Sequence, residues 1–339
     1  MRPVAWIVTL ALPLLPGVAA DSPVCAECHR DVVARFRSTP MAQALVPAAS
    51  CDILKRNPDL TFHEPGYDSR IARDGDRIIL TVTGGGETLT ATLVWAFGRG
   101  QAGQTYVFER DGVWYESRIS YFNALHAVDL TMGAQRDKPK TIEDASGHRL
   151  GPRDAMECFG CHSAGGVSGG RVHLESMSPG VGCESCHGSA TRHVAALRAG
   201  DAAAAKMPKL AGSSTEEISE LCGRCHRTWS QIASNGPRGV LNVRFQPYRL
   251  TNSRCYSVTD ARIRCTACHD PHSPLEKAAS SYDSRCTSCH SGKSGSQTCT
   301  IAKQNCVTCH MPKVELPGAH ARFTDHQIRI ARATDPYPN

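Results

Sequence analysis

The chain has 339 residues, of which 17 are cysteine and 15 are histidine, and it carries a formal net charge of +6. The length allows two ordinary domains, but only 6% of the residues are aromatic, so disulfides or cofactors must supplement the apolar core. After the N-terminal segment no apolar run is long enough to cross a bilayer, which excludes helical membrane spans in the mature chain.

The first 20 residues have the pattern of a secretory signal peptide. Arg2 precedes an apolar stretch over residues 4–15, and small residues follow up to an A-x-A-like cleavage site at Ala20. We therefore predict residues 1–20 as a signal peptide, a mature chain beginning near Asp21, and a location in the periplasm or outside the cell.

Fourteen of the cysteines form seven copies of the pattern C-x-x-C-H. In c-type attachment two thiols bond to the haem vinyl groups, one turn of chain spans the porphyrin edge, and the adjacent histidine is the proximal iron ligand. Zinc sites, thioredoxin-like motifs and disulfide frameworks do not require that histidine. We predict seven covalently bound haem c groups. The attachment cysteines are Cys25, Cys28, Cys158, Cys161, Cys183, Cys186, Cys222, Cys225, Cys265, Cys268, Cys286, Cys289, Cys306 and Cys309, and the proximal histidines are His29, His162, His187, His226, His269, His290 and His310.

The first motif stands apart, in a predicted N-terminal segment of residues 21–56. Residues 57–130 then read as a small antiparallel β module, because five runs rich in β-branched and aromatic residues are separated by turn signals. We predict a five-stranded meander that serves as a packing scaffold, with a docking surface for a partner as the alternative. The predicted strands are residues 67–73, 77–83, 88–97, 105–110 and 113–121.

Residues 131–339 form the predicted six-haem region, which we expect to be helical or irregular. An alanine-rich stretch predicts a helix over residues 189–206, and a capping-box-like start at Thr215 predicts a helix that leads into the fourth motif. The predicted fold class is therefore a mainly α and irregular multihaem cytochrome c fold around stacked haems, into which the β module is inserted.

Eight histidines remain beyond the seven proximal ones, close to the number that bis-histidine ligation of every haem requires. Such irons have no open position and transfer electrons rather than bind substrate. Met41 is a further candidate ligand, because a thioether raises the potential of a haem, with a packed apolar side chain as the alternative. The candidate distal ligands are His63, His126, His148, His173, His193, His272, His320, His326 and Met41. His63 could equally be an ordinary surface histidine.

Three cysteines lie outside the motifs. In an oxidising compartment this odd set predicts one disulfide and one free thiol. We expect Cys255 to pair with Cys299 and Cys51 to stay free.

The positive charge does not predict binding to nucleic acid. Loss of the signal peptide removes Arg2, and each oxidised haem with two propionates and two neutral histidines adds about −1. Seven haems would bring the mature protein to about −2, so the basic residues balance propionates.

Several stretches resemble the cytochrome c-552/c-554 family, tetrahaem proteins that serve ammonia oxidation. Where this chain has Met41, the family usually has a histidine that is a distal ligand. The resemblance implies haem packing and electron transfer, with His193 as a distal ligand. The matching stretches are residues 25–29 with 36–42, residues 182–188 with His193, and residues 265–272. Residues 306–313 with His320 and Thr324-Asp325-His326 resemble the C-termini of related bacterial multihaem proteins.

The sequence favours an electron carrier between redox protein partners over an enzyme. The alternative is a multihaem oxidoreductase acting on nitrite, hydroxylamine or a sulfur oxyanion, which needs a five-coordinate iron. Related nitrite reductases often carry C-x-x-C-K, whereas all seven motifs here end in histidine. A homo-oligomeric, conductive cytochrome filament is a third hypothesis, in which a distal histidine reaches a haem of the next subunit.

Overall fold

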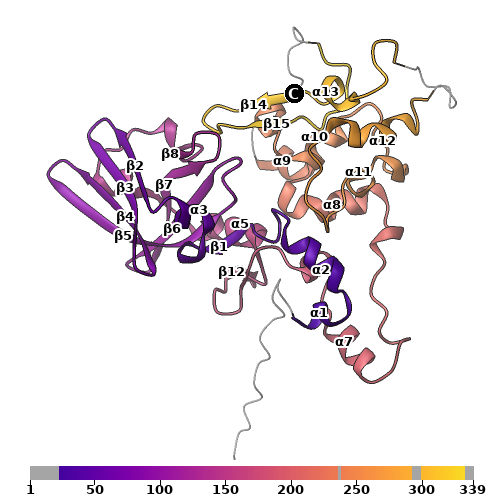
Figure 1. Ribbon diagram of the computed structural model, residues 1–339, viewed down its shortest axis with the longest axis horizontal. Helices are drawn as coiled ribbons and strands as arrows, with labels where there is room; N and C mark the ends of the chain where they lie inside the picture. Colours follow the sequence, from indigo (N-terminus) through magenta and orange to yellow (C-terminus); the bar gives the residue numbers. More distant parts are fainter. Residues whose placement is uncertain (1–22, 236–237, 292–298, 333–339) are drawn as a thin grey trace, which may run out of the picture.

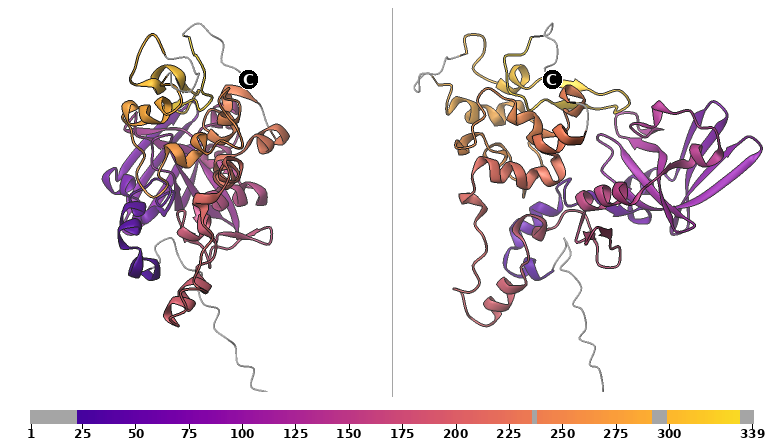
Figure 2. Two further views of the ribbon diagram at one scale, coloured as in Figure 1. Left: turned by 90° about the vertical axis from the view of Figure 1, so that its right-hand side faces the viewer. Right: turned by 180° about the vertical axis from the view of Figure 1, so that it is seen from behind.

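The structure is a computed structural model that describes residues 23–235, 238–291 and 299–332 (Figure 1). The predicted signal peptide of residues 1–20 lies outside the described residues. A curled β-sheet forms one lobe, and short helices and turns form the other, as two further views also show (Figure 2). Across the described part of the chain, no helix is both long enough and apolar enough to cross a bilayer.

A nine-stranded antiparallel sheet is the largest element of the fold. Seven strands pair in the order β2-β3-β4-β5-β6-β7-β8, while β1 pairs with β5 and β9 pairs with β7. The end strands β2 and β8 are in contact, so the sheet curls until it is almost closed. The strands are β1 Leu45–Pro47, β2 Asp59–Glu64, β3 Tyr67–Asp74, β4 Arg77–Gly84, β5 Glu87–Phe97, β6 Gln104–Arg110, β7 Val113–Phe122, β8 Ala127–Leu130 and β9 Gly147–Arg149. Three short hairpins pair β10 Ser163–Ala164 with β13 Ser178–Pro179, β11 Val167–Ser168 with β12 Arg171–Val172, and β14 Lys313–Glu315 with β15 Arg322–Thr324.

This sheet corrects the predicted fold class. The five predicted strands are confirmed as β3 to β7, with each end within one residue of its prediction. The prediction of a mainly α fold with a small β module is wrong, because β1, β2, β8 and β9 extend the meander into the dominant element. The sheet begins and ends outside residues 57–130. The helices are short, and the longest has 12 residues.

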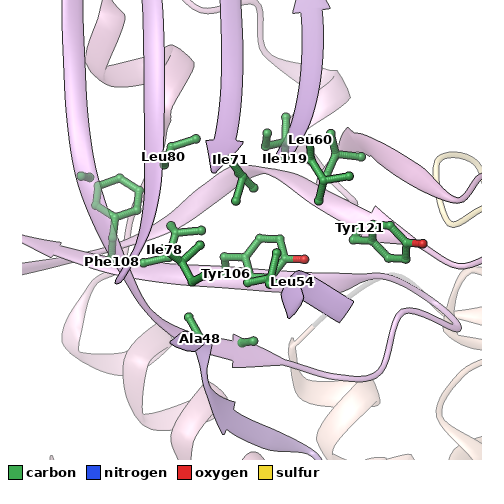
Figure 3. Close-up of a cluster of buried hydrophobic side chains, with 14 of the residues drawn as sticks. Ala48, Leu54, Leu60, Ile71, Ile78, Leu80, Tyr106, Phe108, Ile119 and Tyr121 are labelled. Carbon is green, nitrogen blue, oxygen red and sulfur yellow. The ribbon is translucent and has the colours of Figure 1, made fainter. Parts of the chain in front are cut away.

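Alternating side chains explain why the central strands form. Along β4 buried and more exposed residues alternate, with Ile78, Leu80 and Val82 on the inner face. The β6–β7 turn has a positive φ at both central residues, 51° at Asp111 and 73° at Gly112, which suits a tight hairpin. Side chains of the inner face pack with those of α3 and α4 and form the main core of the protein. Figure 3 shows part of this core.

A buried ion pair connects the two ends of the curled sheet. Arg118 on β7 donates from Nε and Nη2 to the two carboxylate oxygens of Glu64 on β2, at 2.7 and 2.9 Å. Its guanidinium also donates to the backbone carbonyls of Ala134 and Asp137, so the buried charge has polar partners on several sides.

Truncating one inner-face side chain is expected to destabilise the sheet lobe. Leu80 is fully buried, so Leu80→Ala should lower the free energy of unfolding by about 2–5 kcal/mol through lost contacts and a residual cavity. Denaturant unfolding followed by tryptophan fluorescence measures this change. Thr92→Ala on the exposed side of β5 is the control and should change it by within about 1 kcal/mol. Equal effects would contradict the assignment of the core.

The helices are brief segments between loops. Ser214 and Glu217 form a capping box that starts α8, which confirms the predicted helix into the fourth motif. The helix predicted over residues 189–206 is shorter, because Gly200 adopts a φ of 76° and ends it. The helices are α1 Pro23–Cys28, α2 Arg30–Arg37, α3 Asp52–Arg56, α4 Ile142–Ser146, α5 Pro152–His162, α6 Cys183–His187, α7 Thr191–Arg198, α8 Thr215–His226, α9 Trp229–Asn235, α10 Gln246–Thr251, α11 Cys265–Cys268, α12 Asp283–Thr287 and α13 Cys306–His310.

Helix α5 attaches the second motif to the sheet. Phe159 is fully buried and makes edge contacts with Trp95 and Phe97 of β5 and with Trp114 of β7, at centroid distances of 5.2 to 6.5 Å. The ring of His162, at the end of α5, lies 5.3 Å from that of Phe97. Aromatic packing therefore fixes this motif against the outside of the sheet.

Candidate haem-binding sites

All seven C-x-x-C-H motifs lie in, or at the end of, a short helix. The helices are α1, α5, α6, α8, α11, α12 and α13. In the first, fifth and sixth motifs the backbone N–H of the histidine donates to the backbone carbonyl of the first cysteine, at 2.8, 3.0 and 2.9 Å. Both thiols and the histidine therefore belong to one turn of chain, which is the arrangement predicted for haem attachment.

Three motif histidines each face one of the predicted distal ligands. The ring centroids are 6.4 Å apart for His29 and His193, and 5.9 Å apart for His187 and His272. The third pair is His269 and His326, at 6.2 Å. Each pair joins histidines that are distant in sequence, so the tertiary fold creates all three.

These separations fit an iron held between two imidazoles. A metal–nitrogen bond is about 2 Å long and the ring centroid lies about 1 Å behind the nitrogen, so two axial ligands place their centroids about 6 Å apart. Two hollows also open beside motifs. One of about 280 Å³ is lined by Cys268 and His269, and another of about 660 Å³ is lined by Cys186 and by residues of α8.

Hydrogen bonds at Nδ1 orient several of these rings. His162 Nδ1 lies 2.9 Å from the carbonyl oxygen of Ala44, and His310 Nδ1 lies 2.9 Å from that of Arg329. A carbonyl oxygen only accepts, so Nδ1 carries the proton and Nε2 keeps the lone pair that a metal needs. Further Nδ1 contacts join His193 to the carbonyl of Ala205 at 2.5 Å, His326 to that of Thr324 at 3.0 Å, His226 to the side-chain oxygen of Gln246 at 3.0 Å, and His272 to the carboxylate of Asp270 at 3.3 Å.

Burial favours the neutral, metal-binding form of five of the candidate ligands. It lowers the pKa of His326 to about 4 and also lowers the pKa values of His162, His187, His226 and His269. A neutral ring binds a metal without first losing a proton.

The other predicted distal ligands lie elsewhere. His320 donates from Nε2 to Asp129 at 2.8 Å, and its ring packs against Phe122. Both ring nitrogens of His173 have partners, Glu175 at 3.1 Å and the carbonyl of Ser168 at 3.2 Å. His63 is an exposed residue of β2 that contacts Asp68 at 2.7 Å. His148 lies exposed on β9, His126 lies exposed in the β7–β8 turn, and Met41 is half-buried before β1.

Cysteines of different motifs approach one another and so define the order of the motifs in space. A thiol of the first motif lies near enough to a thiol of the third to shift its pKa, and the same holds for the second and fourth motifs, the fourth and fifth, and the sixth and seventh. Thiols of the third and fourth motifs, and of the fifth and sixth, lie near enough for their charges to interact. The pairs are Cys25–Cys183, Cys161–Cys225, Cys222–Cys265, Cys286–Cys306, Cys186–Cys222 and Cys268–Cys286.

Other contacts agree with this order. Arg227, next to the fourth motif, donates to Glu157 in the helix of the second at 2.7 Å. The Asp283 carboxylate, in the helix of the sixth motif, accepts from the backbone N–H groups of Asn305 and Cys306 at 2.7 and 2.9 Å. The motifs thus run one, three, four, five, six, seven, with the second beside the fourth. Helix α1 lies towards the bottom of the helical lobe and α13 towards its top (Figures 1 and 2).

The three remaining cysteines do not form the expected disulfide. Cys255 and Cys299 are both exposed free thiols, so the predicted pairing is absent from the structure. Cys51 is buried in the sheet core, where its thiol donates to the side-chain oxygen of Gln104 at 3.0 Å. Within the described ranges no three His, Cys, Asp or Glu side chains gather as a bare metal site would require.

Sequence reasoning found the motif residues and all three facing histidines, but it missed the groups that orient them. Carbonyls such as those of Ala44 and Arg329 could not have been found, because every residue has one. No sequence pattern links Gln246 to His226 either, because the two residues are 20 positions apart.

Comparison with known proteins finds similarity to multihaem cytochromes. The family described as Cytochrome c554 and c-prime matches residues 114–188, which contain the second and third motifs. The multiheme cytochrome MtrA of Shewanella baltica (strain OS185) is 24% identical over 193 residues, which are 52% of this chain and 49% of that protein. These likenesses support a multihaem c-type cytochrome, a class whose haem c is covalently bound. The chain spans about half the length of the curated relative that it matches, and no solved structure matches it.

Proposed function

We propose that this cytochrome carries seven haems and transfers electrons between redox proteins. The observation that carries the proposal is the series of seven motifs, whose neighbours lie near enough for their cysteines to shift one another's pKa values. Haems attached to these motifs would follow the same order and form a line with a side branch. Bound haem supplies an iron that alternates between the ferric and ferrous states.

The protein's own contribution would be to supply two histidines to each of three irons. We assign His29 with His193, His187 with His272, and His269 with His326 as ligand pairs, on the support of their ring separations and their oriented Nδ1 protons. An iron with two histidines has no position for substrate, which favours electron transfer over catalysis.

The ends of the line suggest where partners dock. The first and seventh motifs lie on α1 and α13, towards the bottom and the top of the helical lobe, so we assign one end of the line to an electron donor and the other to an acceptor. The signal-peptide pattern of residues 1–20 supports export to the periplasm or the cell exterior.

Intact mass and spectroscopy of the purified holoprotein test this proposal. Mass spectrometry should find seven haem additions, and paramagnetic resonance of the oxidised protein should find low-spin iron in at least the three haems to which we assign two histidines. Fewer haems would refute the count. A strong high-spin signal that disappears when nitrite, hydroxylamine or tetrathionate binds would instead favour the oxidoreductase.

A further inference from the structure

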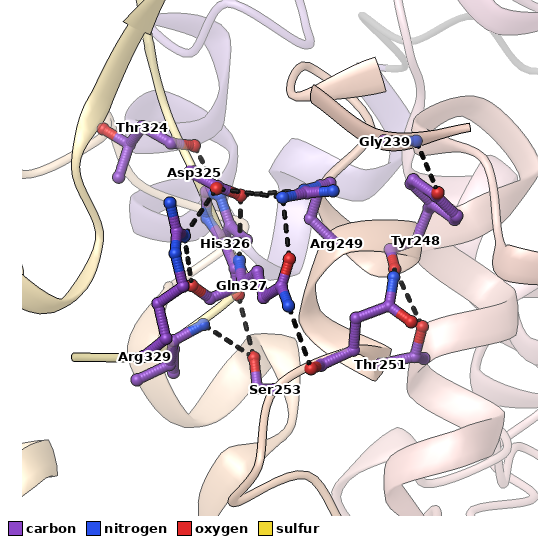
Figure 4. Close-up of polar contacts among 12 residues, drawn as sticks. Gly239, Tyr248, Arg249, Thr251, Ser253, Thr324, Asp325, His326, Gln327 and Arg329 are labelled. Atoms are coloured by element: carbon purple, nitrogen blue, oxygen red, sulfur yellow. Dashed lines mark hydrogen bonds and ion pairs between the residues drawn. The ribbon is translucent and has the colours of Figure 1, made fainter. Parts of the chain in front are cut away.

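We propose that the buried ion pair of Arg249 and Asp325 is a positioning device that holds two haem-ligand histidines in register, His326 for the fifth haem and His310 for the seventh. The inference rests on the proposed haem ligation. It adds residues that touch neither iron nor haem but determine where two ligands lie. Figure 4 shows the cluster.

Asp325 is the centre of the cluster. Arg249 on α10 donates to its two carboxylate oxygens, from Nε at 2.9 Å and from Nη2 at 3.0 Å. Arg329 donates from Nη1 at 2.7 Å, and the backbone N–H of Gln327 donates at 3.1 Å. Both Arg249 and Asp325 are fully buried.

His326, the next residue after Asp325, is held in place by several hydrogen bonds. Its carbonyl accepts from the Ser253 hydroxyl at 3.1 Å. The same hydroxyl accepts from the backbone N–H of Ile328 at 2.8 Å. The ring is oriented by its Nδ1 contact with Thr324 and faces His269. The residues that hold it therefore come from α10 and the following turn, as well as from its own segment.

The same carboxylate reaches the seventh motif through Arg329. The backbone of Arg329 bonds His310 twice: its N–H donates to the His310 carbonyl at 3.1 Å, and its carbonyl accepts from His310 Nδ1 at 2.9 Å. Because the Arg329 side chain is held by Asp325, a displacement of Asp325 moves both the distal ligand of the fifth haem and the orienting acceptor of the seventh.

Energetics favour a positioning role over a purely stabilising one. Removing two charges from water costs about as much as their attraction returns, so a buried ion pair adds little net stability compared with apolar side chains. The forked guanidinium does constrain direction, because it must meet both oxygens of Asp325 in one plane. Fixed direction is what a ligand needs if its Nε2 is to stay on the iron axis.

The test is Asp325→Asn in the haem-loaded protein. The matched control is Asp59→Asn, which breaks an exposed pair in which Arg70 also donates to both carboxylate oxygens. We expect Asp325→Asn to retain all covalent haems by mass but to change the spin state of one or two of the seven irons in paramagnetic resonance. Asp59→Asn should leave the spin state of every iron unchanged. Arg249→Lys should give a smaller high-spin fraction than Arg249→Met, because lysine keeps the charge but loses the fork.

Ser253→Ala is a milder variant in case Asp325→Asn does not fold. It removes the hydrogen bonds of the Ser253 hydroxyl to His326 and Ile328 but leaves Asp325 and its two arginines in place, so we expect a high-spin fraction from the fifth haem. Unchanged spectra in a folded Asp325→Asn or Ser253→Ala protein would overturn the positioning role. His326→Ala separates this failure from failure of the ligand assignment: if it too leaves the spin state of every iron unchanged, then His326 is not a ligand.

Discussion

Replacing His193 by alanine in the haem-loaded protein is expected to convert one low-spin iron to high spin while the haem count stays unchanged. His193 faces His29 at 6.4 Å, and its Nδ1 proton is held by the Ala205 carbonyl, so Nε2 is free to bind the iron. Loss of that nitrogen opens one axial position without affecting the thioether bonds. Paramagnetic resonance measures the change as roughly one-seventh of the iron, since one of seven haems is affected.

His63→Ala is the matched control, because His63 is also a histidine outside the motifs but lies exposed on β2 and contacts Asp68. It should leave the spin state of every iron unchanged. A His193→Ala protein whose irons all remain low-spin would refute the His29–His193 assignment. A lower haem count would show that His193 affects attachment instead.

Removing the fourth haem is expected to interrupt transfer along the protein, whereas removing the second is not. The fourth motif contacts the second, third and fifth, so a chain of haems through it has no bypass among the contacts found. Cys222→Ser with Cys225→Ser removes it, and Cys158→Ser with Cys161→Ser removes the side branch. Each variant should lose one haem by mass, but only the first should slow end-to-end transfer, by an order of magnitude or more.

Cys299 offers an attachment point for measuring the rate of electron transfer from one end of the haem line to the other. It is an exposed free thiol near the last motif, and backbone N–H groups lower its pKa, which favours reaction with a thiol-directed ruthenium photosensitiser. Cys255→Ser removes the competing exposed thiol, and His193→Ala makes the first haem spectrally distinct. Flash illumination then reports the arrival of electrons at the first haem. Equal slowing in both haem-deletion variants would contradict the proposed order.

Local sequence signals were reliable where short-range physics decides the structure. Alternating apolar residues and glycine turns located β3 to β7, and the Ser214–Glu217 capping box marks the start of α8. Strands β1 and β9 could not be predicted in this way, because each has three residues and forms only by pairing with β5 or β7. The fold class was wrong for that reason: local signals indicated a five-stranded module, while long-range pairing made it the dominant sheet.

The seven C-x-x-C-H motifs were determined by the sequence alone, because haem attachment requires two thiols and a histidine within a single turn of chain. Only the tertiary structure decided which histidine faces which. His193 lies 164 residues from His29, and Asp325 lies 76 residues from Arg249, so no local pattern connects either pair. Such contacts depend on how the loops and short helices pack. That packing places motifs that are separate in the sequence next to one another in a line.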